Sequence, residues 1–283
     1  WSIVVSWFIC SKRILFWIKI FCIGGKEKDS QIRQAKETAE KLGIVYIPRG
    51  KLSLEDLREK TGADNILVAR SGQLLIETPE GEMFFHPSMA HLRIKNIRQG
   101  KGDHLVEALA IEPGMRILDC TLGLGSDAIV ESYAAGETGH VTALEANAVM
   151  AEVVRYGLSH CESENPATTA AMRRIEVVAE ENLSFLRSCE DNSYDAVYFD
   201  PMFRHPFQES SSMAPLRSLA DPMPLSEEAL KEALRVSRGR VVLKETSKST
   251  EFDRLGFQST VGGKYSKVKY GILQSLAQSE GKD

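Results

Sequence analysis

The sequence is poor in cysteine and lacks the spacings that cysteine-based sites need. Its five cysteines, at positions 10, 22, 120, 161 and 189, form no CxxC pair and no Cys/His cluster. This odd and scattered set excludes a disulfide framework and disfavours a structural zinc site. No cluster of His, Cys and carboxylate residues suits another metal either, so we expect none. A reducing cytoplasm fits this cysteine usage best.

The sequence also lacks a surplus of positive charge. Its 35 lysines and arginines face 39 acidic residues, which gives a formal net charge of -4. This balance excludes a uniformly basic coat for nucleic acid but leaves room for a local basic face. With 43% hydrophobic and 26% charged residues, the 283-residue chain is long enough for one large domain or two small ones.

A long uninterrupted apolar segment is missing too. The strongly apolar residues 1–23 are broken by Lys12, Arg13 and Lys19, and each such charge costs about 2.5–3.5 kcal/mol near a bilayer centre. We predict a buried strand over residues 18–23 and no membrane partner. For residues 1–18, three interpretations stay open: strand, an extension foreign to the native fold, or membrane contact.

Residues 1–90 are expected to form a small α+β domain. Helical spacing of apolar residues predicts a helix over 29–42, and Ser53 is a candidate cap for a second helix over 52–60. Short apolar runs predict strands at residues 44–47, 66–69, 73–77 and 82–85.

Residues 91–283 follow a different pattern, in which short apolar strands alternate with helices. Strands are predicted at residues 116–120, 140–144, 175–179, 194–199 and 240–244, and helices at residues 127–135, 148–160, 182–188 and 226–237. Two further apolar runs, 256–259 and 267–273, flank Gly262-Gly263 and predict an antiparallel hairpin at the sheet edge. The expected fold class is therefore α/β, with a Rossmann-like, mainly parallel seven-stranded sheet that ends in this hairpin.

A glycine turn after the first of these strands predicts a nucleoside-cofactor site. Glu145 follows the turn by 20 residues, at the end of the next strand, where a carboxylate can accept both ribose hydroxyls. Ala128 replaces the third glycine of a GxGxxG turn, and Asp119 adds negative charge where a dinucleotide would place its phosphates. S-adenosylmethionine, which has no phosphate and carries a cationic sulfur, is favoured, although an NAD-dependent oxidoreductase stays open. The predicted cofactor residues are Asp119, Gly123, Gly125, Ser126, Asp127 and Glu145.

The sequence Asp200-Pro201-Met202-Phe203, at the end of the fourth strand, predicts the catalytic residues. The exocyclic amine of a nucleobase is a poor nucleophile because its lone pair is delocalised into the ring. Asp200 and the carbonyl of Pro201 can accept its two N–H bonds, and Phe203 can stack on the base. A simple Asp-Pro turn beside a core phenylalanine is the alternative interpretation.

A basic segment precedes the second domain and is a candidate for binding phosphates. It contains Arg93, Lys95, Arg98 and Lys101 and no acid, and Lys264, Lys267 and Lys269 can extend the same face. A solvated surface is an equally good interpretation. His91 and His205 are weaker candidates for substrate contact, and Cys120 is expected in the core.

Four stretches give the chain a family resemblance: Met89–His91 with the basic segment behind it, Leu118–Ala128, Tyr198–Phe203 and Arg240–Lys244. In these the chain resembles class I S-adenosylmethionine-dependent methyltransferases, and more closely the bacterial 16S ribosomal RNA guanine-N2 methyltransferase J family. The resemblance implies a cytoplasmic enzyme that methylates guanine N2 in small-subunit ribosomal RNA. It implies cofactor contacts at Ser126, Asp127, Glu145, Ala146, Glu181, Asn182 and Asp200.

Two departures from that family concern the RNA substrate. Arg204 stands where the family usually has proline, and residues 208–219, lysine-rich in the family, contain one arginine and one glutamate here. We count Arg204 with Arg93, Lys95, Arg98 and Lys101 as predicted substrate-binding residues. Because of the two departures, a non-catalytic RNA-binding protein stays open as an alternative. The sequence does not define an oligomeric state.

Overall fold

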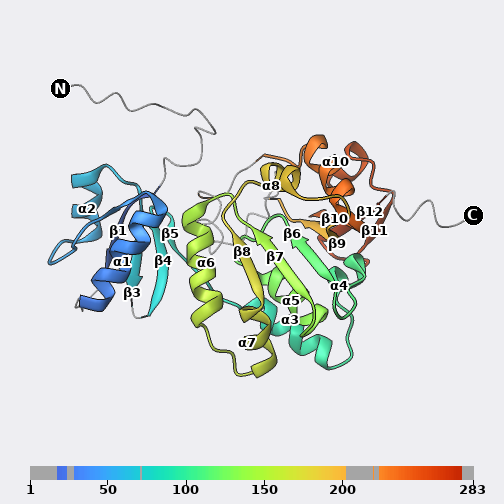
Figure 1. Ribbon diagram of the computed structural model, residues 1–283, viewed down its shortest axis with the longest axis horizontal. Coiled ribbons are helices and arrows are strands. Elements are labelled where there is room, and N and C mark those ends of the chain that lie inside the picture. The colour runs from blue at the N-terminus through green and yellow to red at the C-terminus, as the bar shows by residue number, and fades with distance from the viewer. Residues whose placement is uncertain (1–17, 24–28, 71, 202–218, 220–222, 276–283) are drawn as a thin grey trace, which may run out of the picture.

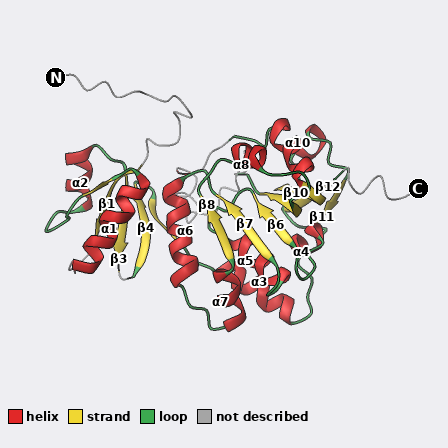
Figure 2. Ribbon diagram, viewed as in Figure 1, coloured by secondary structure: helices red, strands yellow, loops and turns green. Residues whose placement is uncertain are grey.

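The computed structural model describes residues 18–23, 29–70, 72–201, 219 and 223–275, which form two sheets with their helices (Figure 1). A five-stranded sheet lies at one end of the molecule, and a seven-stranded sheet forms the larger part (Figure 2). The predicted class is confirmed: the larger unit is an α/β domain and the smaller one is α+β.

The smaller sheet has the strand order β2-β1-β3-β4-β5. Its strands are β1 Ile18–Ile23, β2 Val45–Tyr46, β3 Asn65–Arg70, β4 Gln73–Thr78 and β5 Gly81–Phe84. β1 pairs in parallel with β2 and β3, and β3, β4 and β5 form an antiparallel meander. The strand predicted over residues 18–23 is thus confirmed, whereas residues 1–17 lie outside the described residues. Helices α1 (Asp29–Leu42) and α2 (Leu54–Thr61) complete this unit, and Ser53 caps α2 as predicted.

The larger sheet has the order β11-β12-β10-β9-β6-β7-β8. Its strands are β6 Arg116–Asp119, β7 His140–Leu144, β8 Ile175–Val178, β9 Tyr194–Phe199, β10 Ser237–Thr246, β11 Ser259–Val261 and β12 Val268–Gln274. β6 to β10 pair in parallel, and β12 runs antiparallel to both β10 and β11. The predicted seven-stranded, mainly parallel sheet with a terminal hairpin is confirmed, although β11 begins at Ser259 and not at the expected residue 256.

Helices cover both faces of this sheet. They are α3 Ser88–Arg98, α4 His104–Leu109, α5 Ser126–Ala135, α6 Ala148–His160, α7 Pro166–Arg173, α8 Asn182–Ser188, α10 Glu227–Val236 and α11 Glu251–Arg254. Alternate strand residues point to opposite faces, so Leu118 and Val197 pack toward α8 and α10, while Ile117 and Ala196 face α4 and α5. Cys120 is in the first of these cores, as expected.

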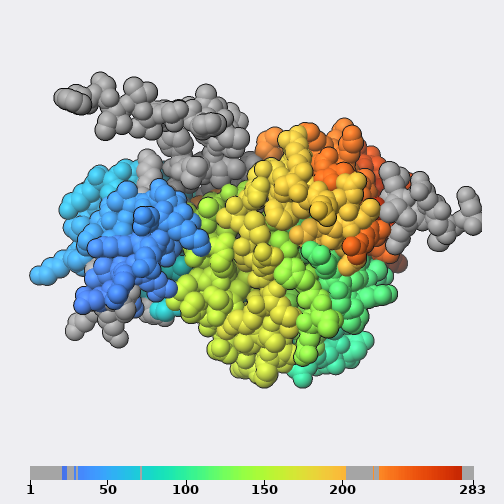
Figure 3. Space-filling view, viewed as in Figure 1, coloured from blue at the N-terminus to red at the C-terminus, as the bar shows by residue number. Residues whose placement is uncertain are grey.

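Helix α6 joins the two units. Its residues Val149 and Val153 share a core with β1, β3 and β4 of the smaller sheet, and its Val154 packs in the core beneath the larger sheet. Figure 3 shows the two units in close contact along this helix. The predicted boundary at residue 90 falls inside α3, which packs on α5, so the chain already enters the larger unit there.

No helix in the described part of the chain is long and apolar enough to cross a membrane. Among the described cysteines, Cys120, Cys161 and Cys189 are free thiols.

The strand order of the larger sheet determines where a ligand site is expected. The chain passes from β6 to β7 on one side and returns to β9 on the other, so the connections diverge where β6 and β9 lie side by side. In open α/β sheets, ligands bind at the carboxyl ends of the strands beside such a switch point.

Candidate active site

A cavity of about 370 Å³ lies at this switch point. That volume is within the usual range for small-molecule sites. The lining residues follow the carboxyl ends of β6, β7, β8 and β9 and precede α10: Cys120, Thr121, Gly123, Leu144, Glu145, Ala146, Met150, Glu180, Glu181, Asn182, Phe199, Asp200, Pro201, Met223, Pro224, Leu225 and Ser226. Four of these described residues are acidic and none is lysine or arginine, so the lining favours a cationic ligand over a phosphate.

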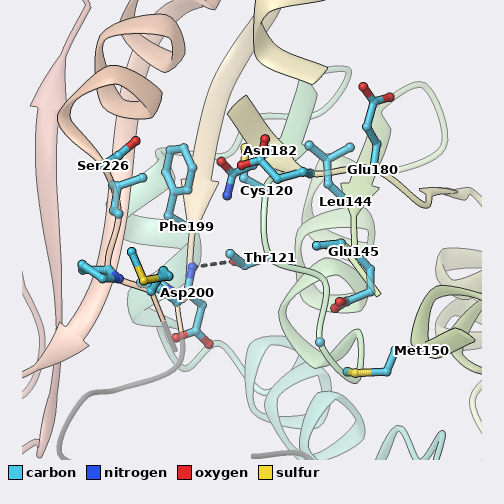
Figure 4. Close-up of a pocket in the computed structure, with 17 residues that line it drawn as sticks. Cys120, Thr121, Leu144, Glu145, Met150, Glu180, Asn182, Phe199, Asp200 and Ser226 are labelled. Atoms are coloured by element: carbon cyan, nitrogen blue, oxygen red, sulfur yellow. Dashed lines mark hydrogen bonds between the residues drawn. The ribbon is translucent and has the colours of Figure 1, made fainter. Parts of the chain in front are cut away.

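Three neighbouring strands, β9, β6 and β7, place the polar groups of the cavity in a row across the sheet. Asp200 follows β9, Thr121 follows β6, and Glu145 follows β7, so Thr121 lies between the two carboxylates (Figure 4). The backbone N–H of Asp200 donates to Thr121 Oγ1 at 2.6 Å. This bond ties the end of β9 to the segment that leads into the glycine turn.

The glycine turn itself depends on a left-handed residue. Gly125 has φ 78°, and a Cβ there would come within 3.3 Å of Val154 and 3.5 Å of Leu122. Glycine is therefore the residue that fits this position on two counts, conformation and space. The tight turn brings the backbone of Gly123 to the cavity wall.

Glu145 is a carboxylate held in place by backbone donors. Its Oε1 accepts the N–H of Asn147 at 2.9 Å. Burial raises the pKa of Glu145 to about 7, against the opposing effect of the backbone hydrogen bonds from Asn147 and Gly123. The group therefore changes charge near neutral pH, and its ionised form can accept two ribose hydroxyls.

Asp200 is paired with a lysine that the sequence did not single out. Lys244 Nζ, from β10, donates to Asp200 Oδ2 at 2.7 Å. Burial raises the pKa of Asp200 to about 6; Lys244 opposes that rise and Asp127 adds to it. The lysine thus keeps Asp200 ionised at neutral pH and fixes one of its two oxygens.

The same lysine begins a chain of alternating charges that leads away from the cavity. Lys244 Nζ lies 2.9 Å from Asp127 Oδ2, which also accepts the hydroxyl of Tyr198 at 2.8 Å. Arg93 donates to the other oxygen of Asp127 and holds Asp103 with two hydrogen bonds of 2.8 Å. Burial alone would raise the pKa of Asp127, but Lys244 and Arg93 bring it well below its ordinary value. We call Asp200, Lys244, Asp127, Arg93 and Asp103 the charge chain.

Two acids behind the charge chain are fully buried. Burial raises the pKa of Asp119 to about 8, despite the hydrogen bond of 2.9 Å that its Oδ1 accepts from the N–H of Thr121. Burial also raises the pKa of Glu131, on α5, well above its ordinary value. Both side chains are therefore protonated at neutral pH, and neither lines the cavity.

The structure brings together part of the predicted cofactor set. Gly123, Glu145, Ala146, Glu181, Asn182 and Asp200 line the cavity, as does the predicted catalytic Pro201. The Glu181 carboxylate caps α8 by accepting the N–H groups of Leu183 and Ser184, so its side chain positions this helix end.

Four predicted cofactor residues do not line the cavity: Asp119, Gly125, Ser126 and Asp127. Asp119 lies beneath the floor because its strand alternation turns it toward α5, where it is fully buried. Asp127 is occupied by Lys244, Arg93 and Tyr198. Gly125 and Ser126 form the turn and the first residue of α5. These four residues therefore lie next to the residues that line the cavity but do not line it themselves.

The predicted substrate residues have different surroundings. Lys95, Arg98 and Lys101 are exposed on α3 and in the segment after it. Arg93 is not available in the same way, since its guanidinium is paired with Asp103 and Asp127. Phe203, Arg204 and His205 lie outside the described residues.

Sequence reasoning missed Thr121, Lys244 and the segment Met223–Ser226. Thr121 and Lys244 lie in stretches that had been marked for other reasons, but their partners are 79 and 44 residues away along the chain. The signal that could have found Lys244 is a lysine near the end of an apolar strand, β10, whose parallel neighbour β9 is followed by an aspartate.

Comparison with known proteins first defines the class of fold. The structure aligns with a crystal structure of the SAM-dependent methyltransferase NGO1261 from Neisseria gonorrhoeae with a TM-score of 0.66, covering 94% of this chain and 99% of that one at 15% identity. At this identity the likeness establishes the shared Rossmann-like methyltransferase fold.

The family follows from the sequence. Residues 30–269 match the family described as "Putative SAM-dependent methyltransferase", and the chain belongs to this family. Its cofactor is S-adenosylmethionine, and the alternative of an NAD-dependent oxidoreductase is not supported.

Relatives in sequence point in the same direction. The chain is 38% identical over 250 residues to "Uncharacterized protein YpiP" of Bacillus subtilis (strain 168), covering 88% of this chain and 97% of that protein. It is 29% identical over 173 residues to "Ribosomal RNA small subunit methyltransferase J" of Dechloromonas aromatica, covering 59% of this chain and 67% of that protein. The protein "Ribosomal RNA small subunit methyltransferase J" of Pseudomonas paraeruginosa is 26% identical, over 82% of this chain and 87% of that protein.

Proposed function

We propose that this methyltransferase transfers a methyl group to the exocyclic amine of a nucleobase, with guanine N2 in small-subunit ribosomal RNA as the acceptor. The observation that carries the proposal is the placement of Asp200-Pro201 on the wall of the cofactor cavity, opposite Glu145. The named ribosomal RNA methyltransferases among the relatives support the choice of RNA.

The cavity fits S-adenosylmethionine by charge and by size. The cofactor, when bound, supplies a methyl group activated by a positively charged sulfur. Glu145 is placed to accept the ribose hydroxyls, and Asn182 with Glu180 flanks the wall after β8, where an adenine can be held. Four lining carboxylates favour the cofactor's positive charges.

Asp200 would orient the acceptor amine. Lys244 binds its Oδ2, so Oδ1 is the oxygen left, among the described contacts, to accept an N–H from the amine. The carbonyl of Pro201 would accept the second N–H and turn the lone pair toward the methyl carbon. Because the nitrogen sheds one proton as its bond to carbon forms, the Asp200 carboxylate is placed to take that proton. Alignment of the reacting atoms at about 3–3.5 Å supplies the remaining rate enhancement.

The test is methyl transfer from labelled S-adenosylmethionine to 16S ribosomal RNA and to 30S subunits taken from a strain that lacks the gene. Nucleoside mass spectrometry would identify the product, and we expect N2-methylguanosine. Asp200→Ala should bind the cofactor and transfer methyl at least about 100-fold more slowly, equivalent to about 2.7 kcal/mol. Asp64→Ala, which alters an exposed acid in the smaller unit, is the matched control.

The outcomes separate the alternatives. Normal turnover in Asp200→Ala would remove that residue from its role. RNA binding by the wild-type protein without transfer of label would favour the non-catalytic RNA-binding alternative. A labelled nucleoside other than N2-methylguanosine would keep the methyltransferase and change the acceptor. The cytoplasmic location stays a prediction.

A further inference from the structure

The hairpin loop between β11 and β12, Gly262–Lys267, lies at the edge of the sheet where the active site opens. Lys244, which binds Asp200, pairs with Tyr270 of β12, and Ser247 N–H donates to the carbonyl of Lys267 at 2.9 Å. Lys267 is three positions before Tyr270, which is about 10 Å along an extended strand. The loop therefore ends beside the strand that carries Lys244, at the carboxyl edge of the parallel strands.

The loop presents an aromatic ring to solvent. Tyr265 is 89% exposed, and Lys264 Nζ lies 5.5 Å from the centroid of its ring. A single exposed apolar residue needs no explanation by itself. Here, however, the ring is accompanied by a lysine, in a loop that leads into β12 at the carboxyl edge of the parallel strands.

Internal contacts fix the shape of this loop. Lys269 Nζ donates to the carbonyls of Gly262 and Gly263 at 3.1 and 3.3 Å. Ser266 N–H donates to the carbonyl of Gly263 at 3.0 Å, and Ser266 Oγ donates to the carbonyl of Val268 at 2.7 Å. A loop held in this way presents its ring without a large ordering cost on binding.

The charge around the loop suits a polyanion. Residues 254–279 contain no acid, in a chain whose formal net charge is -4. Residues 83–102, which include α3, are a second acid-free segment. The loop lies against α4, which follows the second segment: a Cβ on Gly263 would lie 3.6 Å from His104 Nε2, and α4 packs on β11 and β12. Lys95, Arg98 and Lys101 are exposed in the second segment, on α3 and directly after it.

We propose that this loop docks a single-stranded segment of the RNA substrate, with an unpaired base stacked on Tyr265 and a neighbouring phosphate held by Lys264. Stacking on an exposed ring tolerates any base, so the loop would contribute affinity and position while the cavity selects the methylated base. This inference rests on the proposed function, since it presumes an RNA substrate. It goes further by requiring that the docked segment be unpaired.

The test measures binding of a labelled single-stranded RNA oligonucleotide by fluorescence anisotropy over a series of salt concentrations. Tyr265→Ser should weaken binding about 5- to 150-fold, the range equivalent to about 1–3 kcal/mol per stacked base. Tyr265→Trp keeps a stacking ring and should bind like the wild type. Lys264→Gln should lower the slope of log K against log salt by about 1, a change that Tyr265→Ser should not produce.

Controls make the result specific. Lys51→Gln removes an exposed lysine from the smaller unit and should leave both affinity and slope unchanged. Calorimetry should give wild-type affinity for S-adenosylmethionine in all of these variants, since none of the altered residues lines the cavity. In turnover, the KM for RNA should rise in Tyr265→Ser while the KM for the cofactor stays fixed.

Failure of this inference differs from failure of the proposed function. If the wild-type protein methylates RNA and Tyr265→Ser binds that RNA unchanged, the loop inference is overturned and the function stands. If Tyr265→Trp loses as much affinity as Tyr265→Ser, stacking is also overturned. If the wild-type protein neither binds nor methylates RNA, the proposed function itself fails and the loop inference fails with it.

Discussion

Replacement of Lys244 by methionine tests how the active site keeps Asp200 ionised. In the wild-type protein, Lys244 Nζ lies 2.7 Å from Asp200 Oδ2, and the pKa of Asp200 is about 6. Because the proposed mechanism needs the carboxylate form, activity should fall as the pH falls through about 6. Methionine keeps most of the side chain's length and apolar contact but removes the charge.

The size of the effect follows from the pair. An opposite charge at this distance ordinarily lowers the pKa of an aspartate by about 1–3 units. Its loss would place the pKa of Asp200 at roughly 7–9. With a value near 8, about a tenth of the carboxyl groups are ionised at pH 7, compared with about nine tenths when the pKa is 6. We therefore expect about a 10-fold loss of methyl transfer at pH 7, recovered at higher pH.

The assay is the pH dependence of kcat/KM for the RNA substrate between pH 5 and pH 9.5. Lys248→Met, which changes an exposed lysine after β10, is the matched control, and Lys244→Arg should keep most of the wild-type profile. Breaking a buried ion pair also costs stability, commonly about 3–5 kcal/mol, so thermal unfolding must show that the variant is folded at the assay temperature. A folded Lys244→Met protein whose pH profile superimposes on the wild-type profile would refute the reasoning.

Two further variants examine the cofactor wall and the junction between the two units. Glu145→Gln should weaken S-adenosylmethionine binding about 10-fold at pH 8, which is the loss expected for a charged hydrogen-bonding group. The wild type should lose affinity as the pH drops through about 7, and the variant should not. Calorimetry at several pH values measures this, and an unchanged pH dependence in the variant would show that Glu145 has no such role. Gly157→Ala should lower the free energy of unfolding by about 1–3 kcal/mol, because the added Cβ would lie 2.2 Å from Phe85 Cγ. Denaturant unfolding measures this, and a midpoint equal to that of the wild type would contradict the packing.

The sequence predicted the strand and helix pattern of the larger unit well, for a local reason. Helix α6 has the bounds that were predicted, 148–160, because Asn147 caps it and its apolar residues recur at helical spacing. Helix α7 was not predicted, although Asn165 and Pro166 provide a start signal, because its apolar residues are three alanines and one methionine, which mark a buried face less clearly than larger side chains do. The α3 segment was recognised by its charge and not by its helical form.

The site was predicted only where its groups follow strand ends. Glu145 and Asp200 each follow a strand, and parallel strands bring such positions to one edge. The partners of Arg93 could not be predicted in this way. It pairs with Asp103 and Asp127, 10 and 34 residues away, and such pairings depend on how α3, α4 and α5 pack. Spacing along the chain carries no information about that packing.

The preference for a cationic cofactor has a different physical origin from the one that the sequence suggested. The sequence argument relied on Asp119, whose pKa of about 8 leaves it uncharged at neutral pH. The negative charge comes instead from the charge chain, whose three carboxylates outnumber its two cations, and from Glu180 and Glu181 on the cavity wall.

This surplus explains both the buried acids and the choice of ligand. Asp119 and Glu131 remain protonated because burial and the nearby carboxylates disfavour another negative charge. The same carboxylates would repel a negatively charged pyrophosphate in the cavity, whereas they would attract a positively charged sulfonium. We therefore expect the charge chain to orient Asp200 for the acceptor and, through the same unbalanced charge, to favour the methyl donor.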